Sequence, residues 1–157
     1  MNINVVLVEP EIPQNTGNIS RTCAALGADL HLVRPLGFDI TDRQLKRAGL
    51  DYWDKLNVYY YDSIAGLFDK YKGANFLFFS TKATRNYWEA TYREGCFIVF
   101  GKETAGLPEQ LIFSNFERCY RLPMRRDIRS LNLSNTVAVV AYEALRQNIQ
   151  SNSTVIL

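Results

Sequence analysis

The sequence predicts an α/β fold with a mainly parallel sheet flanked by helices. Residues 3–8 and 76–79 are short, almost wholly apolar runs, which is the pattern of strands buried on both faces of a parallel sheet. Helical segments that end at glycines such as Gly27 and Gly73 lie between runs of this kind. Strands and helices alternate along the chain, and in such sheets ligands bind at the carboxyl ends of the strands.

The individual elements follow from the same patterns. Strands are expected at residues 3–8, 30–33, 58–61, 76–79, 96–100 and 118–122. Helices are expected at residues 19–26, 41–49, 63–71 and 134–150. The second helix opens on a capping box formed by Thr41 and Gln44, and Asp62 or Ser63 caps the third. Residues 9–18 contain two prolines and are expected to form a loop.

The composition is that of one globular domain spanning residues 1–157. Hydrophobic residues make up 47% of the chain and charged residues 22%, which is enough for a full core without disulfides or metal. The chain opens directly into a predicted strand, and no apolar run approaches the roughly 18 residues of a membrane span. We therefore expect a cytoplasmic protein with no membrane partner.

Cysteine and histidine are not expected to supply the chemistry. Cys23, Cys96 and Cys119 form no C-x-x-C pair, so we expect buried, reduced thiols and no metal site. His31 lies in an apolar strand, as a packed or surface residue would, so a hydrolase that pairs serine or cysteine with histidine is disfavoured. The glycine pattern of residues 101–106 matches neither a Rossmann fingerprint nor a P-loop.

Basic charge is concentrated in residues 118–129. The whole chain has a formal net charge of +2, whereas this window holds five arginines against one acidic residue. Such a concentration is typical of a phosphate-binding surface, although a solvated charged face has the same composition. The overlapping residues 124–135 add serine, asparagine and a row of backbone amides that enter the last helix.

Three loops at the carboxyl ends of predicted strands carry motifs. They are EPEIPQNTGNISR at 9–21, FGKETAGLP at 100–108 and LPMRRDIRSLNLSN at 122–135. In order and spacing, and over almost the whole chain, they resemble the three motifs of the SPOUT class of RNA methyltransferases. The short length and the sequence RAGLDY at 47–52 resemble the minimal branch that methylates the ribose 2′-hydroxyl of the tRNA wobble nucleotide, cytidine or uridine 34.

This resemblance implies a homodimer with a C-terminal trefoil knot. It also implies that the knotted loops bind S-adenosylmethionine as methyl donor, without a metal. Gly101 would let the backbone approach the ligand closely, and Phe79 and Leu122 would supply an apolar wall, although ordinary core packing would use the same side chains. The donor-binding positions carried over from the family are Phe79, Gly101, Leu122, Met124, Ser130 and Leu131.

The resemblance further implies a catalytic set. Its members are Arg21, Asn15, Glu103, Asn132 and Ser130. Transfer requires the ribose oxygen to line up with the methyl group and to lose its proton, and Arg21 is the family's proposed base. Because arginine stays protonated in proteins, a phosphate clamp is an equal alternative for Arg21. Glu103 has an alternative role as well, holding Asn15 and the loops in place. Lys102 replaces a proline common in related sequences, which affects only the local loop shape.

The expected partner is the tRNA anticodon stem-loop. Phosphate contacts are expected from Arg34, Arg43, Arg47, Lys82, Arg125, Arg126 and Arg129. Stacking on unpaired bases, or alternatively packing in the core or a dimer interface, is expected of Tyr52, Trp53, Tyr87 and Trp88. Two other functions stay open, namely a SPOUT methyltransferase for another RNA such as ribosomal RNA, and an RNA-binding protein without activity. The intact catalytic set argues against the second of these.

Overall fold

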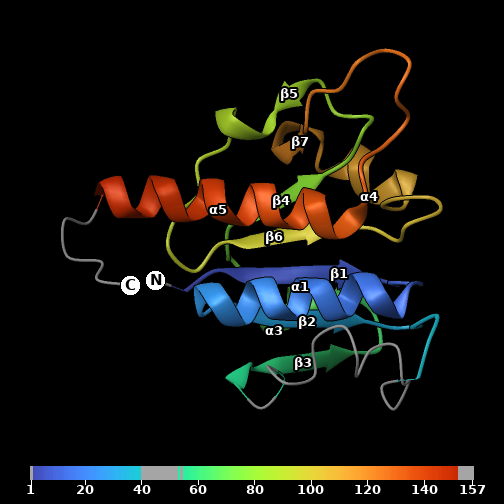
Figure 1. Cartoon of the computed structure of the whole chain (residues 1–157), viewed down its shortest axis with the longest axis vertical. Helices are drawn as coiled ribbons and strands as arrows, with labels where there is room; N and C mark the ends of the chain where they lie inside the picture. The colour runs from blue at the N-terminus through green and yellow to red at the C-terminus, as the bar shows by residue number, and fades with distance from the viewer. Residues whose placement is uncertain (1, 40–52, 54, 152–157) are drawn as a thin grey trace.

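The computed structural model describes residues 2–39, 53 and 55–151. Within them one parallel sheet has the strand order β3-β2-β1-β6-β4-β7-β5 (Figure 1). The strands are β1 (Asn4–Val8), β2 (Asp29–Val33), β3 (Val58–Tyr61), β4 (Phe76–Phe79), β5 (Arg85–Asn86), β6 (Phe97–Phe100) and β7 (Cys119–Arg121). The helices are α1 (Pro13–Leu26), α3 (Ile64–Lys70), α4 (Glu109–Ser114) and α5 (Leu133–Ser151), with short 3-10 turns η2 (Tyr87–Glu89) and η3 (Phe116–Arg118).

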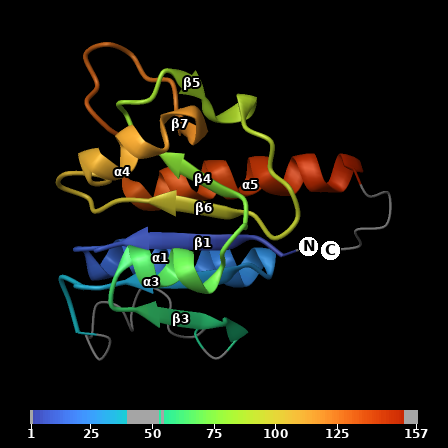
Figure 2. The same ribbon diagram turned by 180° about the vertical axis from the view of Figure 1, so that it is seen from behind.

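Two helical layers cover the sheet. Helices α1 and α5 lie on the face seen in Figure 1, and α3 and α4 lie on the face seen in Figure 2. The apolar run of β1 supplies both cores, because Val5 and Leu7 pack with α1 and α5 while Val6 and Val8 pack on the other face. The predicted α/β class with a parallel sheet is therefore confirmed.

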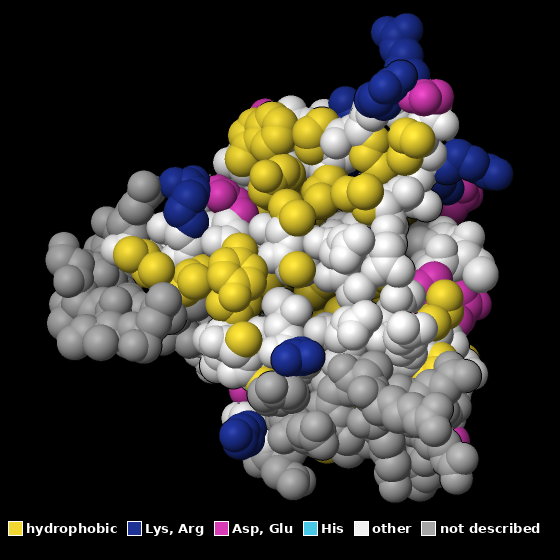
Figure 3. All heavy atoms as spheres, viewed as in Figure 1, with side chains coloured by type: hydrophobic (Ala, Val, Ile, Leu, Met, Phe, Trp, Pro, Cys, Tyr) yellow, Lys and Arg dark blue, Asp and Glu magenta, His cyan; other side chains and the backbone are white. Residues whose placement is uncertain are grey.

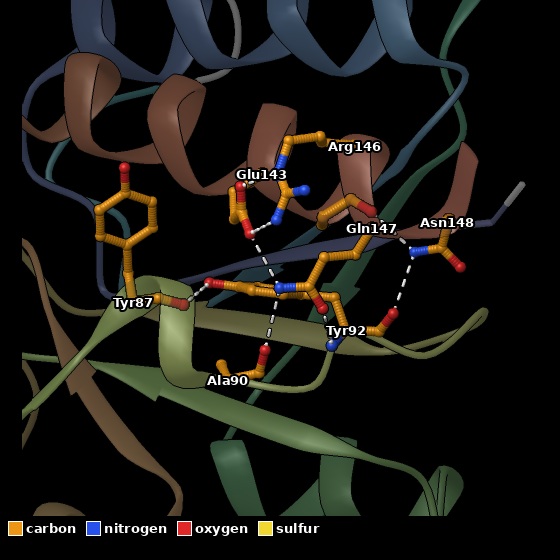
Figure 4. A network of polar contacts seen from close by, with 8 residues as sticks. Tyr87, Ala90, Tyr92, Glu143, Arg146, Gln147 and Asn148 are labelled. Atoms are coloured by element: carbon orange, nitrogen blue, oxygen red, sulfur yellow. Dashed lines mark hydrogen bonds and ion pairs between the residues drawn. The ribbon is translucent and has the colours of Figure 1, made fainter. Parts of the chain in front are cut away.

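Helix α5 is held to the segment that follows η2 by a polar network (Figure 4). The side chain of Gln147 donates to the carbonyl of Ala90 at 3.1 Å and accepts from the amide of Tyr92 at 3.2 Å. The buried amide of Asn148 donates to the carbonyl of Tyr92 at 3.0 Å, and the Tyr92 hydroxyl donates to the carbonyl of Tyr87 at 2.7 Å. These bonds join α5 to the segment after η2, since buried backbone carbonyls require partners.

The first helix starts earlier than predicted. It begins at Pro13, so residues 13–18 are helical and not part of a loop, while Gly27 ends it with φ 64° as expected. The sequence-based assignment failed because residues 13–18 include glycine, threonine and asparagines, which have weak helix propensity. The packing of Ile19 and Cys23 against the core stabilises the helix instead.

Four short elements were not predicted, and one predicted helix falls outside the described residues. Strand β5, helix α4 and the 3-10 turns are too short to give a periodic pattern. The expected helix at 41–49 lies outside the described part. In the described part of the chain, no helix is long and apolar enough to cross a membrane.

The three cysteines and the histidine are buried. Cys23, Cys96 and Cys119 are free thiols, as predicted, and burial raises the pKa of Cys96 to about 12. His31 is fully buried, with Nδ1 2.9 Å from the Tyr61 hydroxyl and Nε2 3.0 Å from Oδ1 of Asn4. Both ring nitrogens therefore have structural partners inside the protein, as predicted for a packed residue.

This histidine should make the protein less stable in acid. Burial, assisted by the Lys70 ammonium, lowers the pKa of His31 from 6.5 to about 4. Between these two values the unfolded chain binds a proton that the folded chain does not, so stability falls as the pH drops from 6.5 to 4. The full loss is about 3 kcal/mol. Urea unfolding at pH 7, 5.5 and 4 measures it, and His31→Gln should flatten this part of the profile; an unchanged slope in the variant would assign the effect to carboxylates.

Candidate functional site

A cavity of about 800 Å³ opens at the carboxyl ends of β4, β6 and β7. The first turn of α1 and the segment that leads into α5 close its other sides. Nine predicted site residues line it: Asn15, Phe79, Gly101, Glu103, Leu122, Met124, Ser130, Leu131 and Asn132. The structure thus brings together residues from all three motif loops, as expected for the carboxyl edge of a parallel sheet.

The loop after β6 is folded tightly back on itself. The amide of Gly106, which has φ 70°, donates to the carbonyl of Lys102 at 2.8 Å. A Cβ on Gly101 would lie 2.0 Å from the carbonyl carbon of Gly106 and 2.1 Å from the amide nitrogen of Leu107. Gly101 is therefore required by the loop's own backbone, which leaves the main chain of this loop exposed to the cavity.

A directional chain of hydrogen bonds crosses the cavity wall. Glu103 Oε1 accepts from Nδ2 of Asn15 at 3.0 Å, and Oδ1 of Asn15 accepts from Nδ2 of Asn132 at 3.0 Å. Oδ1 of Asn132 then accepts from the amide and the hydroxyl of Ser134 at 2.9 and 2.6 Å. Each amide donates toward the carboxylate end, so the anionic Glu103 fixes the orientation of both asparagines.

Asn132 also starts the last helix. Its Oδ1 accepts from the backbone amides of Ser134 and, at 3.4 Å, Asn135, which are orphan donors in the first turn of α5. The expected helix start at Ser134 is thus one residue late, and the capping side chain is that of Asn132. A single side chain therefore links the helix to the cavity wall.

Glu103 binds the N-terminal end of α1. Its Oε2 accepts from the amide of Glu11 at 2.8 Å and its Oε1 from the amide of Ile12 at 3.2 Å. No side chain within the helix performs this capping role, because the N-cap residue is Ile12. The positive end of the helix dipole favours a carboxylate at this place.

Two further contacts join the same loops. Lys102 Nζ lies 2.9 Å from Oε2 of Glu9, and the amide and hydroxyl of Thr104 donate to Oε2 of Glu11 at 3.1 and 2.8 Å. The bonds from Thr104 lower the pKa of Glu11. Residues 102–104 thus each bind the segment before or at the start of α1, a clamp that no single motif in the sequence indicated.

The apolar wall consists of stacked strand-end residues. Phe79 is 6% exposed and its ring stacks on Phe100 with centroids 5.0 Å apart. Leu122 is 8% exposed, whereas Leu131, near the other end of the same loop, is 44% exposed. Core packing and cavity lining therefore coincide at Phe79 and Leu122, and Leu131 offers a free apolar surface.

The predicted arginines occupy different places. Arg21 is exposed on α1 and does not line the cavity of this chain. Arg129 lines the cavity, and so does Arg121, which the motif comparison had not singled out. Arg125 lies 3.3 Å from Asp127, with both side chains largely exposed. Among the described residues, Arg121, Arg126 and Arg129 have no ion-pair partner.

The other expected RNA contacts are scattered. Lys82 lines the cavity and pairs with Glu109, and Arg34 pairs with Asp62 at 2.9 Å. Trp88 is 49% exposed on η2. Trp53 and Tyr87 are half-buried against the core, and Arg43, Arg47 and Tyr52 lie outside the described residues.

The fold and the cavity together define a parallel α/β protein whose ligand site lies in loops at the carboxyl edge of the sheet. Comparison with known proteins gives the family. The chain belongs to the SpoU rRNA Methylase family, which matches residues 2–142. The family recognised from the three motifs is thereby confirmed.

Similar proteins span nearly the same length. A Bacillus subtilis protein, provisionally named as a tRNA (cytidine(34)-2'-O)-methyltransferase, is 55% identical over 148 residues, 92% of each chain. A solved structure concerned with the 2-OH methylation of C/U34 on tRNA is 45% identical, with a TM-score of 0.90 and coverage of 95% of this chain and 97% of that one. The SpoU methyltransferase AviRb from Streptomyces viridochromogenes, solved with AdoMet, shares the fold at 24% identity and a TM-score of 0.82, over 93% of this chain and 57% of that one.

Proposed function

We propose that this protein transfers a methyl group from S-adenosylmethionine to the ribose 2′-hydroxyl of the wobble nucleotide 34, cytidine or uridine, of tRNA. The observation that carries the proposal is the chain Glu103–Asn15–Asn132, because it joins the three motif loops around one cavity. The family membership and the relatives' named activity support the same reaction.

The cavity suits the methyl donor. Its volume of about 800 Å³ falls in the usual range for small-molecule sites. Apolar side chains from Phe79, Leu122, Met124 and Leu131 suit an adenine ring, and the folded-back loop at Gly101 offers backbone polar groups beside them. When bound, S-adenosylmethionine supplies a methyl group on a positively charged sulfur. Ser130 and Asn132 line the same cavity, where they would orient the ribose.

The proton of the 2′-hydroxyl must leave as the new bond forms. Arg21 is proposed either to take part in that proton transfer or to clamp the adjacent phosphate, and its place outside the cavity lining of this chain favours the clamp. Asn15 and Glu103 are proposed to act mainly by position, because their hydrogen-bonding groups are already occupied by one another and by the backbone of residues 11–12.

Replacement of Arg21 should separate RNA recognition from donor binding. Arg21→Ala is expected to lower methyl transfer at least about 100-fold, since charge-assisted contacts to phosphate contribute about 1.5–3 kcal/mol each and orient the acceptor as well. Its affinity for S-adenosylmethionine should change less than about twofold. Single-turnover rates and calorimetric titration measure the two quantities, and transfer at near wild-type rate would remove Arg21 from the site.

We propose that the exposed arginines 125, 126 and 129 bind RNA phosphates, the role in which they were predicted. Arg121 joins them, because it lines the cavity as Arg129 does and has no ion-pair partner in the described part of the chain. Basic groups without carboxylate partners attract phosphate without first breaking an ion pair. The proposed RNA surface therefore adjoins the proposed donor site.

We also propose that the protein acts as a homodimer. Val139, Tyr142 and Ile149 are 41%, 53% and 36% exposed and recur along one stripe of α5. Figure 3 shows hydrophobic side chains gathered along this helix and above it. An apolar stripe of this kind on a surface helix suits contact with a second copy. Light scattering after gel filtration tests this, and Tyr142→Glu should shift a dimer toward monomer.

The remaining features come from the resemblance. We propose a single domain over residues 1–157, a C-terminal trefoil knot and a cytoplasmic location. Residues 122–132 arch from β7 to α5, and Asn132 bonds to Asn15 in the first turn of α1, so this segment closes against a distant part of the chain. Such knots are rare, so the family resemblance carries this part.

The decisive experiment uses labelled S-adenosylmethionine. The protein is incubated with total tRNA or with ribosomal RNA, and labelled nucleosides are mapped by mass spectrometry. Label at the ribose of nucleotide 34 supports the proposal, and label confined to ribosomal RNA supports the second candidate, a substrate that the family's name includes. If no RNA were labelled, the remaining candidate would be an RNA-binding protein without methyltransferase activity.

A further inference from the structure

Two phenylalanines stand exposed beside the cavity. Phe113 on α4 is 82% exposed and Phe116 on η3 is 44% exposed. Helix α4 borders the cavity, because Ile112, the residue before Phe113, lines it. In Figures 1 and 2, α4 lies next to β7 at the carboxyl edge of the sheet. Single exposed apolar residues are ordinary, but two aromatic rings in four residues at a ligand site call for a partner.

Two guanidinium groups are held by residues that neighbour these phenylalanines in sequence. Arg118 Nη2 donates to Oδ1 of Asn115 at 2.7 Å, and Asn115 lies between the two phenylalanines in sequence. Arg85 Nη1 donates to the carbonyl of Glu117 at 2.7 Å, and its guanidinium lies 4.9 Å above the ring of Tyr120. Among the described residues, neither arginine has a carboxylate within ion-pair distance.

The acidic residues nearby do not cancel this charge. Glu109, in the first turn of α4, forms an ion pair with Lys82, which lowers the pKa of the carboxyl. Glu117 is exposed, and its backbone carbonyl is the group that holds Arg85. The surface therefore offers exposed aromatic rings together with positively charged groups whose positions are fixed.

We propose that Phe113, Phe116, Arg85 and Arg118 form a stacking platform for an unpaired base next to the reacting nucleotide. Aromatic rings beside basic groups are what single-stranded nucleic acid requires, since bases stack on the rings while the charges follow the phosphates. Because α4 borders the cavity at Ile112 and the nearby arginines attract phosphate, RNA is the occupant that fits this surface. The inference rests on the proposed function for the identity of the RNA.

The platform is tested with an anticodon stem-loop that carries 2-aminopurine next to nucleotide 34. Stacking on Phe113 should quench its fluorescence in the wild type, and Phe113→Ala should abolish the quenching. Phe113→Ala should also raise the KM for tRNA about tenfold while kcat and the affinity for S-adenosylmethionine change less than twofold. Because Phe113 is exposed, the melting temperature of the alanine variant should match that of the wild type.

Two substitutions at the same position serve as controls. Phe113→Trp keeps a stacking ring and should restore KM and quenching, whereas Phe113→Leu keeps apolar volume only and should behave like the alanine variant. Full rescue by leucine would mean that position 113 makes a general apolar contact, such as one with a protein, and does not stack on a base. An unchanged KM and unchanged quenching in Phe113→Ala would overturn the platform.

The readouts also separate this inference from the proposed function. Quenching by a wild-type protein that transfers no methyl group would sustain the platform and overturn the reaction. Methyl transfer to nucleotide 34 without any effect of Phe113→Ala would overturn the platform and sustain the reaction.

Discussion

Gly101→Ala should nearly abolish binding of S-adenosylmethionine. The added Cβ would meet the carbonyl carbon of Gly106 at 2.0 Å and the amide of Leu107 at 2.1 Å, and neither backbone group can move aside without opening the turn. The bond from the Gly106 amide to the Lys102 carbonyl would then break. We expect the dissociation constant to rise at least about 100-fold and the stability to fall by about 1–3 kcal/mol or more, as for overpacking elsewhere.

The matched control is Gly66→Ala on α3. Its Cβ would lie 3.6 Å from the Ser63 hydroxyl, an ordinary contact, and the helix should gain about 0.5–1 kcal/mol from the better helix former. Calorimetric titration with S-adenosylmethionine and thermal unfolding measure both variants. If Gly101→Ala bound the donor within threefold of the wild-type affinity, the loop could not be the rigid wall that the structure describes.

The sequence predicted most of the sheet because its strands are short apolar runs that differ sharply from their surroundings. The strands predicted at residues 76–79 and 58–61 begin and end at the same residues as β4 and β3. The start of α1 was missed because the acceptor that caps it, the carboxylate of Glu103, is 91 residues away from Ile12 in the sequence. Local propensity cannot include such a contact. Helix α4 and strand β5 failed for a different reason, since elements of six and two residues give no usable period.

The site residues that could be predicted are those that lie within the three sequence motifs. Nine of the candidate residues line one cavity, but the reason for Gly101 differs from the expected one, since the close approach is to its own loop and not only to a ligand. The clamp of Lys102 and Thr104 onto Glu9 and Glu11 was missed, because polar contacts between distant loops leave no spacing signal. The roles of Arg21 and of Phe113 depend on a bound RNA and stay predictions.

The strict donor and acceptor order at the site explains why asparagine, and not a similar residue, occupies positions 15 and 132. An amide has one donating and one accepting end, so a chain of two amides can pass direction from Glu103 to the first turn of α5. A carboxylate at either position has two accepting ends and would face another acceptor. Asn15 and Asn132 therefore couple the direction of the hydrogen bonds, the cap of α5 and the cavity wall.

Asn132→Asp should lower methyl transfer strongly without unfolding the last helix. The aspartate keeps the oxygen that caps Ser134 and Asn135, and aspartate caps a helix about as well as asparagine. Its other oxygen would face Oδ1 of Asn15, which cannot turn away because Nδ2 of Asn15 is bonded to Glu103. We expect kcat to fall about 100-fold and the melting temperature to change by less than about 4 °C, measured by single-turnover kinetics and calorimetry.

The control is Asn135→Asp, which adds the same charge on the same helical turn but at an exposed position that does not line the cavity. If both variants lost activity equally, repulsion between added negative charge and RNA would explain the loss, and the hydrogen-bond direction would be irrelevant. Loss confined to Asn132→Asp, with full transfer when residue 132 is asparagine, assigns the effect to the hydrogen bond that the Asn132 amide donates to Asn15.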